Sequence, residues 1–332
     1  INTTINGGGN QNVFSGGMAN GTIVNDGWQI ISGTATGTHV YAKGVQSVLN
    51  GGRVANTTVY TGGNQEVCSG GLSNDTIING GQQNVYGTAM DTVLYGGKQT
   101  VYGSASGTII NGGIQEVRSL ADRTLVNNGG TQVVKAAGRA TNTTVGRGGI
   151  QQAEGNAEDA VVSNGGVQYV YGHAANTTVA YGGRQAVMSG GRATGTTIGG
   201  VVELAVGGNL DASLLPQGEL VLQGASDGQY TVGSLAASGG RVTIASGKTV
   251  GRQLTINALT GAAKFVINTD LAQHRADLIT VAGATAAADN QLQVRYDPQF
   301  ENGQVKNGGG ALFANTPAGV GFQAQPTERG AY

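Results

Sequence analysis

The chain has 332 residues, of which 61 are glycine and 4 are proline, and charged residues make up 11%, against about 25% in typical globular domains. Glycine does not recur at every third position, which excludes collagen, and abundant valine and isoleucine with little charge excludes a disordered chain. The formal net charge is −1, so we expect no nucleic acid partner, because a phosphate backbone requires a positive surface.

A motif Gly-Gly-x-Gln-x-Val, seen as residues 62–67, returns every 16 to 19 residues over the first 190 positions. Its glutamines are Gln11, Gln29, Gln46, Gln65, Gln83, Gln99, Gln115, Gln132, Gln151, Gln168 and Gln185. A self-similar period of roughly 20 residues, rich in glycine and β-branched residues, indicates a solenoid of stacked coils. Three short runs separated by glycine turns in each period predict an all-β, parallel β-helix with three strands per coil.

The interior of a coil follows from strand alternation, which places residues two apart on one face. In the coil of residues 76–89 we expect Ile77, Val85 and Ala89 to point inward, together with Gln83. Stacked glutamines ~4.8 Å apart then form a ladder in which each amide donates and accepts. The alternative is a bulge that turns the glutamine outward at the corner.

Stacking also aligns outward residues into columns. Polar residues recur beside the repeated threonine and predict an exposed amide and hydroxyl face for self-association, formed by Asn56, Thr57, Asn74, Asp75, Asp91, Asn142, Thr143, Asn176 and Thr177. A second column, directly after the buried valine, predicts an aromatic ridge of Phe14, Tyr86, Tyr102 and Tyr171. That ridge suits stacking on sugar rings or on a second molecule, and its simpler interpretation is ordinary exposed strand residues.

From about residue 201 the glutamines disappear and apolar residues become denser. The sequence therefore predicts a repeat region over residues 1–200, larger coils over 201–262 and a C-terminal cap over 263–332. A cap is expected because the end of a solenoid exposes unpaired strand groups. Ile1 opens directly into a repeat, which suggests a mature segment excised from a longer protein.

The repeat Thr-[Val/Ile]-x-x-Gly-Gly-x-Gln-x-Val resembles the passenger repeats of the AIDA-type self-associating autotransporters, the class of AIDA, TibA and antigen 43. The tail resembles the autochaperone region of such passengers through Phe265, Asp270, Asp277, Val281, Gly283, Leu292 and Val294. The last three residues, 330–332, resemble the strand that precedes the translocator linker. The resemblance implies a right-handed β-helix with an autochaperone-like cap.

The same resemblance implies a function. Such a passenger lies on the Gram-negative cell surface or is secreted, after export through a translocator barrel that this sequence does not contain. It promotes autoaggregation, biofilm formation and adhesion, with itself on neighbouring cells as an antiparallel partner and host-cell surfaces or glycans as further partners. The resemblance also implies that the chain is O-heptosylated by a heptosyltransferase before export. The expected acceptors lie four residues after their glutamines: Ser15, Ser69, Ser119 and Ser189.

Parallel β-helices also include polysaccharide-cleaving enzymes, so carboxylate pairs need weighing. Asp75 and Asp91 fall one coil apart in one column, a spacing that suits a retaining glycosidase or a calcium ion. No arginine or histidine of the neighbouring coils converges on them, and accidental stacking of loop aspartates is the simpler interpretation. A glycan-binding or glycan-degrading β-helix, and a heptosylated host-cell adhesin without self-association, remain the alternatives.

Metal and nucleophile chemistry finds little support in the sequence. His39, His173 and His274 fall in separate coils without a second ligand at metal-binding spacing. Cys68 has no histidine in its own coil to activate it. We therefore expect no enzyme, no cofactor and no metal site.

Overall fold

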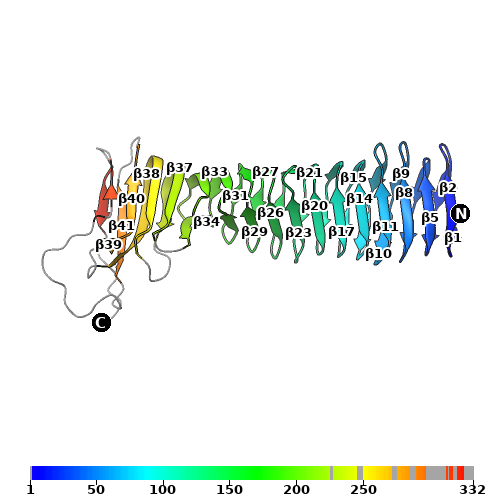
Figure 1. Cartoon of the computed structure of the whole chain (residues 1–332), viewed down its shortest axis with the longest axis horizontal. Coiled ribbons are helices and arrows are strands. Elements are labelled where there is room, and N and C mark those ends of the chain that lie inside the picture. The colour runs from blue at the N-terminus through cyan, green and yellow to red at the C-terminus, as the bar shows by residue number, and fades with distance from the viewer. Residues whose placement is uncertain are drawn as a thin grey trace. The chain divides into compact units, whose positions relative to one another are not determined.

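The structure, a computed structural model, describes residues 2–224, 227–244, 250–270, 275–283, 289–296, 312, 314–316 and 320–324. The regular elements of these residues are strands β1 to β43 (Figure 1), without a helix among them. No segment of the described ranges is therefore a helix long and apolar enough to cross a membrane. The chain divides into two compact units, Ile1–Val161 with Gly165–Gln168, and Val162–Asn164 with Tyr169–Tyr332.

Three faces build each coil of the first unit. We name each after a buried residue that recurs in it: the glutamine of the first, the alanine of the second, and for the third the threonine directly before each strand, such as Thr57. The glutamine face comprises β2 (Gly9–Val13), β5 (Gly27–Ile31), β8 (Gly44–Val48), β11 (Asn64–Val67), β14 (Gln82–Val85), β17 (Lys98–Val101), β20 (Ile114–Val117), β23 (Thr131–Val134) and β26 (Ile150–Ala153). The alanine face comprises β3 (Met18–Asn20), β6 (Thr34–Thr36), β9 (Arg53–Ala55), β12 (Leu72–Asn74), β15 (Thr88–Met90), β18 (Ser104–Ser106), β21 (Leu120–Asp122), β24 (Arg139–Thr141) and β27 (Asn156–Glu158). The threonine face comprises β1 (Thr4–Ile5), β4 (Ile23–Val24), β7 (His39–Val40), β10 (Thr58–Tyr60), β13 (Ile77–Asn79), β16 (Val93–Leu94), β19 (Ile109–Ile110), β22 (Leu125–Val126) and β25 (Thr144–Val145).

Parallel pairing between successive coils keeps equivalent residues in register. β10, β11 and β12 pair with β13, β14 and β15, so that Gln65 lies beside Gln83 and Val67 beside Val85. The solenoid of parallel strands is the right-handed β-helix that the sequence predicted. Strand alternation within this register decides which side chains face the interior.

The glutamines form the expected ladder inside the first unit. Gln83 Nε2 donates to Gln65 Oε1 at 2.5 Å, and Gln99 Nε2 donates to Gln83 Oε1 at 2.6 Å. The same bond joins every successive pair from Gln11 to Gln168. Thr92 Oγ1 of the following coil donates to Gln83 Oε1 at 3.4 Å. The ladder is confirmed, and the outward bulge is wrong, because these bonds offset the cost of burying an amide.

Apolar columns fill the rest of the interior. Val85 and Ala89 are buried as expected, but Ile77 is 40% exposed and its neighbour Ile78 is buried. The prediction for Ile77 was wrong because a shift of one residue reverses which side of a strand a side chain faces. Asp75, which turns the chain before this strand, sets that phase with a left-handed backbone.

In the second unit the first strands keep the lengths seen in the first unit, and longer strands appear from β33 onward. β28 (Val161–Val162) and β29 (Val167–Val170) contain residues of both units. The others are β30 (His173–Ala175), β31 (Thr178–Val179), β32 (Arg184–Val187), β33 (Arg192–Ile198), β34 (Val201–Ala205), β35 (Asn209–Leu214), β36 (Glu219–Gln223), β37 (Gln229–Thr243), β38 (Gln253–Asp270), β39 (Arg275–Ala276), β40 (Leu278–Val281), β41 (Asn290–Tyr296), β42 (Ala314–Asn315) and β43 (Phe322–Ala324). Apolar residues replace the glutamine after Gln185, in register: Val202, Leu220, Val242, Phe265 and Leu292.

A buried carboxylate joins three segments in the C-terminal coils. Asp277 Oδ1 accepts the backbone N–H groups of Gly251 and Arg252, each at 3.0 Å. Its Oδ2 accepts the N–H of Asn268 in β38 at 2.9 Å. Burial raises the pKa of this carboxyl group, and the three donors oppose that shift. Of the other residues that resemble the autochaperone motif, Phe265, Val281 and Leu292 are buried, whereas residues 330–332 lie outside the described residues.

Candidate functional site

A column of left-handed residues follows the corner between the alanine and threonine faces. Asn56, Asp75, Asp91 and Asn142 are exposed there, with φ of 55°, 51°, 53° and 53°. Their backbones connect the coils, because each donates its N–H to the residue that precedes the next member of the column; Asp75 N, for example, donates to Met90 O at 3.1 Å. Glycine, asparagine and aspartate tolerate this conformation best. The backbone thus requires much of the composition that the sequence suggested for a binding face.

The left-handed column has other members in the first unit. They are Gly21, Gly37, Gly107, Arg123 and Asp159, all with positive φ. Arg123 shows that a long charged side chain also fits. Its side chain is 70% exposed, lies 3.0 Å from Asp122 Oδ2 and donates to Ser106 Oγ at 2.7 Å. Hydrogen bonds from Asn142 and Thr141, together with the Arg123 charge, lower the pKa of Asp122.

Several residues expected on the self-association face lie elsewhere. Thr57, Thr143 and Thr177 are buried. Thr57 Oγ1 donates to Gln46 Oε1 at 3.1 Å, and Thr143 Oγ1 donates to Gln132 Oε1 at 3.2 Å. Their assignment to an exposed face was wrong, because the residue after each left-handed position points inward to the ladder. Asn74 is half-buried one residue before the column, and exposed Asn176 belongs to the second unit.

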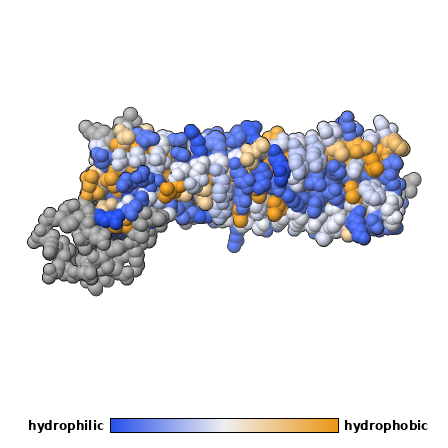
Figure 2. Space-filling model, in the orientation of Figure 1, coloured by the Kyte–Doolittle hydropathy of each residue, from blue (hydrophilic) through white to orange (hydrophobic). Residues whose placement is uncertain are grey.

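An apolar column that the sequence reasoning missed lies beside the left-handed column. Ile77, Val93, Ile109 and Leu125 face outward from β13, β16, β19 and β22 in direct register, and we call them the apolar stripe. Ile77 is 40% exposed and the other three are half-buried. The sequence did contain a signal for this column, because these strands have two consecutive apolar residues, such as Ile109-Ile110. Only one of two consecutive strand residues can face the interior, so the other must face outward. Figure 2 shows apolar side chains gathered in patches among polar ones on the visible surface.

The corner on the other side of the apolar stripe is polar and aromatic. Tyr60, Asn79, Tyr95, Asn111 and Asn127 occupy it in successive coils. Tyr95 is 61% exposed, and Asn127 Nδ2 donates to Asn111 Oδ1 at 3.2 Å. The threonine face of the first unit is therefore three columns wide: left-handed, apolar and corner.

The aromatic ridge reduces to one stacked pair. The ring centres of Tyr86 and Tyr102 lie 4.7 Å apart, and the angle between the ring planes is 4°. The Arg118 guanidinium carbon lies 5.6 Å from the ring centre of Tyr102. Phe14 stands several coils away, and Tyr171 belongs to the second unit. Because the facing sides of the two rings cover each other, the pair mainly presents ring edges, whereas a sugar stacks on a ring face.

The expected glycan acceptors occupy two kinds of corner. Ser15, Ser69 and Ser189 are exposed, and the glycine after each has a φ of 77°, 77° and 79°. A hydrogen bond closes each turn, such as Gly71 N to Cys68 O at 2.8 Å. Ser119 is half-buried and has no such glycine, because its corner is shorter. The prediction of four equivalent corners was wrong for Ser119.

Of the residues considered for chemistry, Asp75 and Asp91 do occupy successive coils of the left-handed column, whereas His39, His173 and Cys68 lie in separate coils. In the described ranges, no group of three or more histidine, cysteine, aspartate or glutamate residues could hold a metal ion. His39 Nδ1 lies 3.5 Å from Tyr60 Oη, and His173 Nε2 lies 3.1 Å from Thr194 Oγ1; His274 lies outside the described residues. Burial, followed by the charge of a nearby glutamate, raises the pKa of the Cys68 thiol, which disfavours the nucleophilic thiolate.

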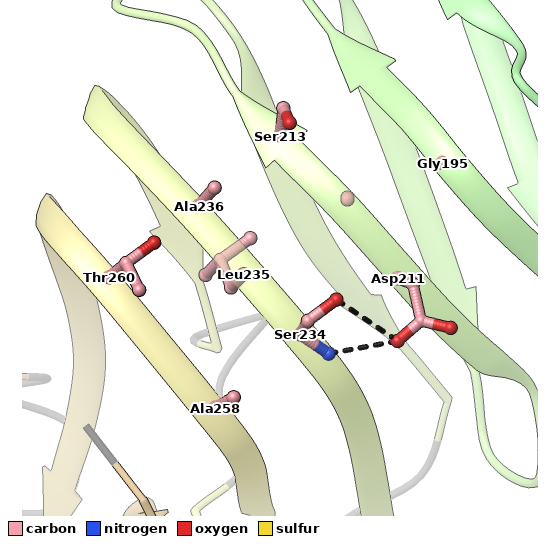
Figure 3. Close-up of a pocket in the computed structure, with 9 residues that line it drawn as sticks. Gly195, Asp211, Ser213, Ser234, Leu235, Ala236, Ala258 and Thr260 are labelled. Carbon is pink, nitrogen blue, oxygen red and sulfur yellow. Dashed lines mark hydrogen bonds between the residues drawn. The ribbon is translucent and has the colours of Figure 1, made fainter. Parts of the chain in front are cut away.

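One shallow pocket lies on β35, β37 and β38 of the second unit (Figure 3) and has a volume of about 190 Å³. Asp211 Oδ1 accepts from Ser234 N at 2.9 Å and from Ser234 Oγ at 3.2 Å. The remaining lining is small and mostly apolar, including Leu235, Ala258 and Thr260. Since Asp211 is the one titratable group among the lining residues, the pocket lacks the paired carboxylates of glycoside hydrolysis.

Comparisons with known proteins agree with this fold. The Pertactin family matches residues 232–308. The crystal structure of a TibA fragment, hyper-glycosylated in a reaction catalysed by TibC, is similar with a TM-score of 0.66 and 34% sequence identity. The match covers 71% of this chain and 92% of that fragment. Among curated proteins, none matches the sequence.

Proposed function

This chain belongs to the AIDA/TibA-type autotransporter passengers, and from that membership we propose that it is a self-associating adhesin that promotes autoaggregation and biofilm formation. Passengers of this family lie on the Gram-negative cell surface or are secreted. The partner we propose is the same protein on a neighbouring cell, held by lengthwise pairing of β-helix faces. Export through a translocator barrel is part of the same proposal.

The observation that carries this proposal is the left-handed column. Asn56, Asp75, Asp91 and Asn142 present exposed polar side chains from a backbone that the stack holds in place. Each hydrogen bond across an interface contributes about 0.5–1.5 kcal/mol. Repetition along the stack and many copies per cell supply the avidity. A pre-formed surface loses little conformational freedom on pairing.

Glycine substitutions test the column without disturbing the backbone. We expect N56G, D75G, D91G and N142G together to slow the settling of cells several-fold at equal surface display, since Gly107 already occupies this column. The matched control is K43G with N128G, two exposed left-handed positions at the other end of the threonine face. Settling as fast as the unaltered protein, with the fold intact, would contradict the proposal.

Glycosylation is a second proposal, favoured by the similar TibA fragment that TibC glycosylates. The exposed turn serines Ser15, Ser69 and Ser189 are the acceptors we propose for a heptosyltransferase. Co-expression with such an enzyme is expected to raise the intact mass by whole heptose units, fewer in the triple alanine variant. Host-cell binding, measured with and without the transferase, separates a host-cell adhesin from a self-associating one.

We propose that the chain has no catalytic activity. Incubation with polysaccharides should therefore release no reducing sugar.

A further inference from the structure

We propose that two copies of the first unit pair antiparallel through the threonine face, about a two-fold axis midway between the coils of Val93 and Ile109. This inference rests on the proposed self-association and names the face and the register. A two-fold interface uses the same surface on both partners, so the face must be complementary to its own reversed order.

The apolar stripe meets that requirement. Its four residues occupy consecutive coils, and threonine holds the same position on both sides, Thr58 before it and Thr144 after it. Reversal about the proposed axis places Ile77 opposite Leu125 of the second copy and Val93 opposite Ile109. Apolar side chains then cover apolar side chains, and the two threonines face each other at the ends. Contiguous apolar patches on a protein surface can mark interaction sites, whereas single exposed apolar residues are ordinary; the residues of this stripe are contiguous over four coils.

The left-handed column is complementary in charge under the same reversal. Its order is Asn56, Asp75, Asp91, Gly107, Arg123, Asn142. Asp75 therefore faces Arg123 of the second copy at both ends of the stripe, Asp91 faces Gly107, and Asn56 faces Asn142. Within the described part of the chain, neither Asp75 nor Asp91 forms an ion pair. Arg123 keeps a 70% exposed side chain while it contacts Asp122.

The corner column is complementary in size. Tyr60 faces Gly146 of the second copy, Asn79 faces Asn127, and Tyr95 faces Asn111. The aromatic rings thus meet a glycine or an amide and never each other. Opposed amides both donate and accept hydrogen bonds.

The direction of pairing follows from the same order of charges. An axis that lies in the interface across the stack reverses the coils and leaves each column opposite itself. An axis along the stack would keep the coil order and bring the left-handed column against the corner column, where Asp75 and Arg123 meet no opposite charge. The antiparallel arrangement is the one that pairs the charges.

The contact is small. Three columns over six coils, at ~4.8 Å per coil and ~3.3 Å per residue, cover far less than the ~800 Å² per partner of a standard interface. A single pair of molecules is therefore weak, and many copies on each cell hold cells together. The tests below use displayed protein and covalent trapping for this reason.

A charge exchange tests the register. D75R and R123D leave the backbone unstrained, because aspartate and arginine both occupy this column with a φ of 51°. We expect cells that display either variant to settle at least tenfold more slowly than unaltered cells, since like charges oppose each other. A mixture of the two populations, or the double variant D75R/R123D, should settle at nearly the original rate. Single variants that settle normally, or a mixture that does not recover, would overturn the register.

Covalent trapping tests the same contact on the purified full chain. In a C68S background, D75C/R123C should form covalent dimers with a short thiol-reactive cross-linker chosen to span the ~10 Å between opposed sheet faces, a distance too long for a disulfide. Within one copy the two positions lie three coils apart, ~14 Å at ~4.8 Å per coil, which such a linker does not span. D75C alone should remain monomeric. If unaltered cells aggregate while D75C/R123C stays monomeric, the register is wrong and self-association stands; if unaltered cells do not aggregate at all, both proposals fail.

Discussion

At the scale of single residues, backbone conformation and interior hydrogen bonding explain most of the residue types that recur in the repeat. Asn56, Asp75 and Asp91 occupy positions that require positive φ, so their residue types reflect the turn as well as any partner. The threonine after each such position points inward and bonds to the glutamine ladder, as Thr57 does to Gln46. An exposed residue that contributes to the surface is thus followed by a buried residue that stabilises the interior.

The left-handed turn at Asn56 makes a prediction about stability. N56A should lower the free energy of unfolding by about 1 kcal/mol, because alanine has a β-carbon without the short polar side chain that lets asparagine adopt the left-handed region. N56G should change it by only a few tenths, because glycine adopts positive φ freely. Urea unfolding of the full chain measures both. An alanine variant as stable as the glycine variant would show that the turn does not depend on this residue's φ of 55°.

The glutamine ladder makes a larger prediction. Q83L should destabilise the chain by about 2 kcal/mol or more, because Gln99 Nε2, Thr92 Oγ1 and Gln65 Oε1 lose a buried partner. Gln82, the exposed neighbour on the same strand, supplies the control: Q82L should stay within about 0.5 kcal/mol. Equal urea midpoints for Q83L and Q82L would refute a stabilising ladder.

At the scale of elements, two things must be fixed: which residues of each strand face the interior, and how successive segments of the C-terminal coils are connected. The threonine-face strands are two or three residues long, so one left-handed residue decides their phase, as Asp75 does for Ile77 and Ile78. In the C-terminal coils a single carboxylate, Asp277, connects the residues before β38, β38 itself and the residue before β40.

The Asp277 connection predicts a pH dependence. Burial raises the pKa of this group in the folded chain, so the folded state holds the proton more tightly than the unfolded state. Its contribution to stability is greatest below the unfolded pKa of about 3.9 and is lost as the pH rises through the raised pKa. The stability difference between the unaltered chain and D277N should therefore shrink from about pH 4 upward, as urea midpoints across that range can test. A difference that grows with pH would contradict the sign.

At the scale of the whole molecule, the proposed function depends on repetition. In the proposed pairing, the apolar stripe and the left-handed column contribute small contacts at each coil, and their order along the stack provides specificity. Asp75 and Arg123 sit symmetrically about the centre of the stripe, which single residues or single strands cannot encode. A surface organised in this way is complementary to its own reversed copy, as the proposed pairing requires.

Ionic strength should separate the two kinds of contact. The Debye length falls to ~3 Å at 1 M salt, so unaltered cells should settle roughly two- to threefold more slowly there than at 0.1 M, because the apolar stripe still pairs. Cells displaying D75R should respond in the opposite sense and settle faster in high salt, since screening relieves the repulsion between like charges. Settling rates of both populations across a NaCl series provide the measurement, and parallel responses would argue against charge registration.

The sequence by itself determined the coil, its period and the composition of its interior. The spacing of Gln65, Gln83 and their equivalents predicted the ladder, and Val85 and Ala89 were placed correctly, because a repeated period can bury its polar residues only by stacking them in register. The tertiary structure decided which of Ile77 and Ile78 faces water and that Thr57 is buried. Those outcomes depend on a left-handed φ at Asn56 and Asp75, and residue type alone does not fix it, since Arg123 adopts the same conformation.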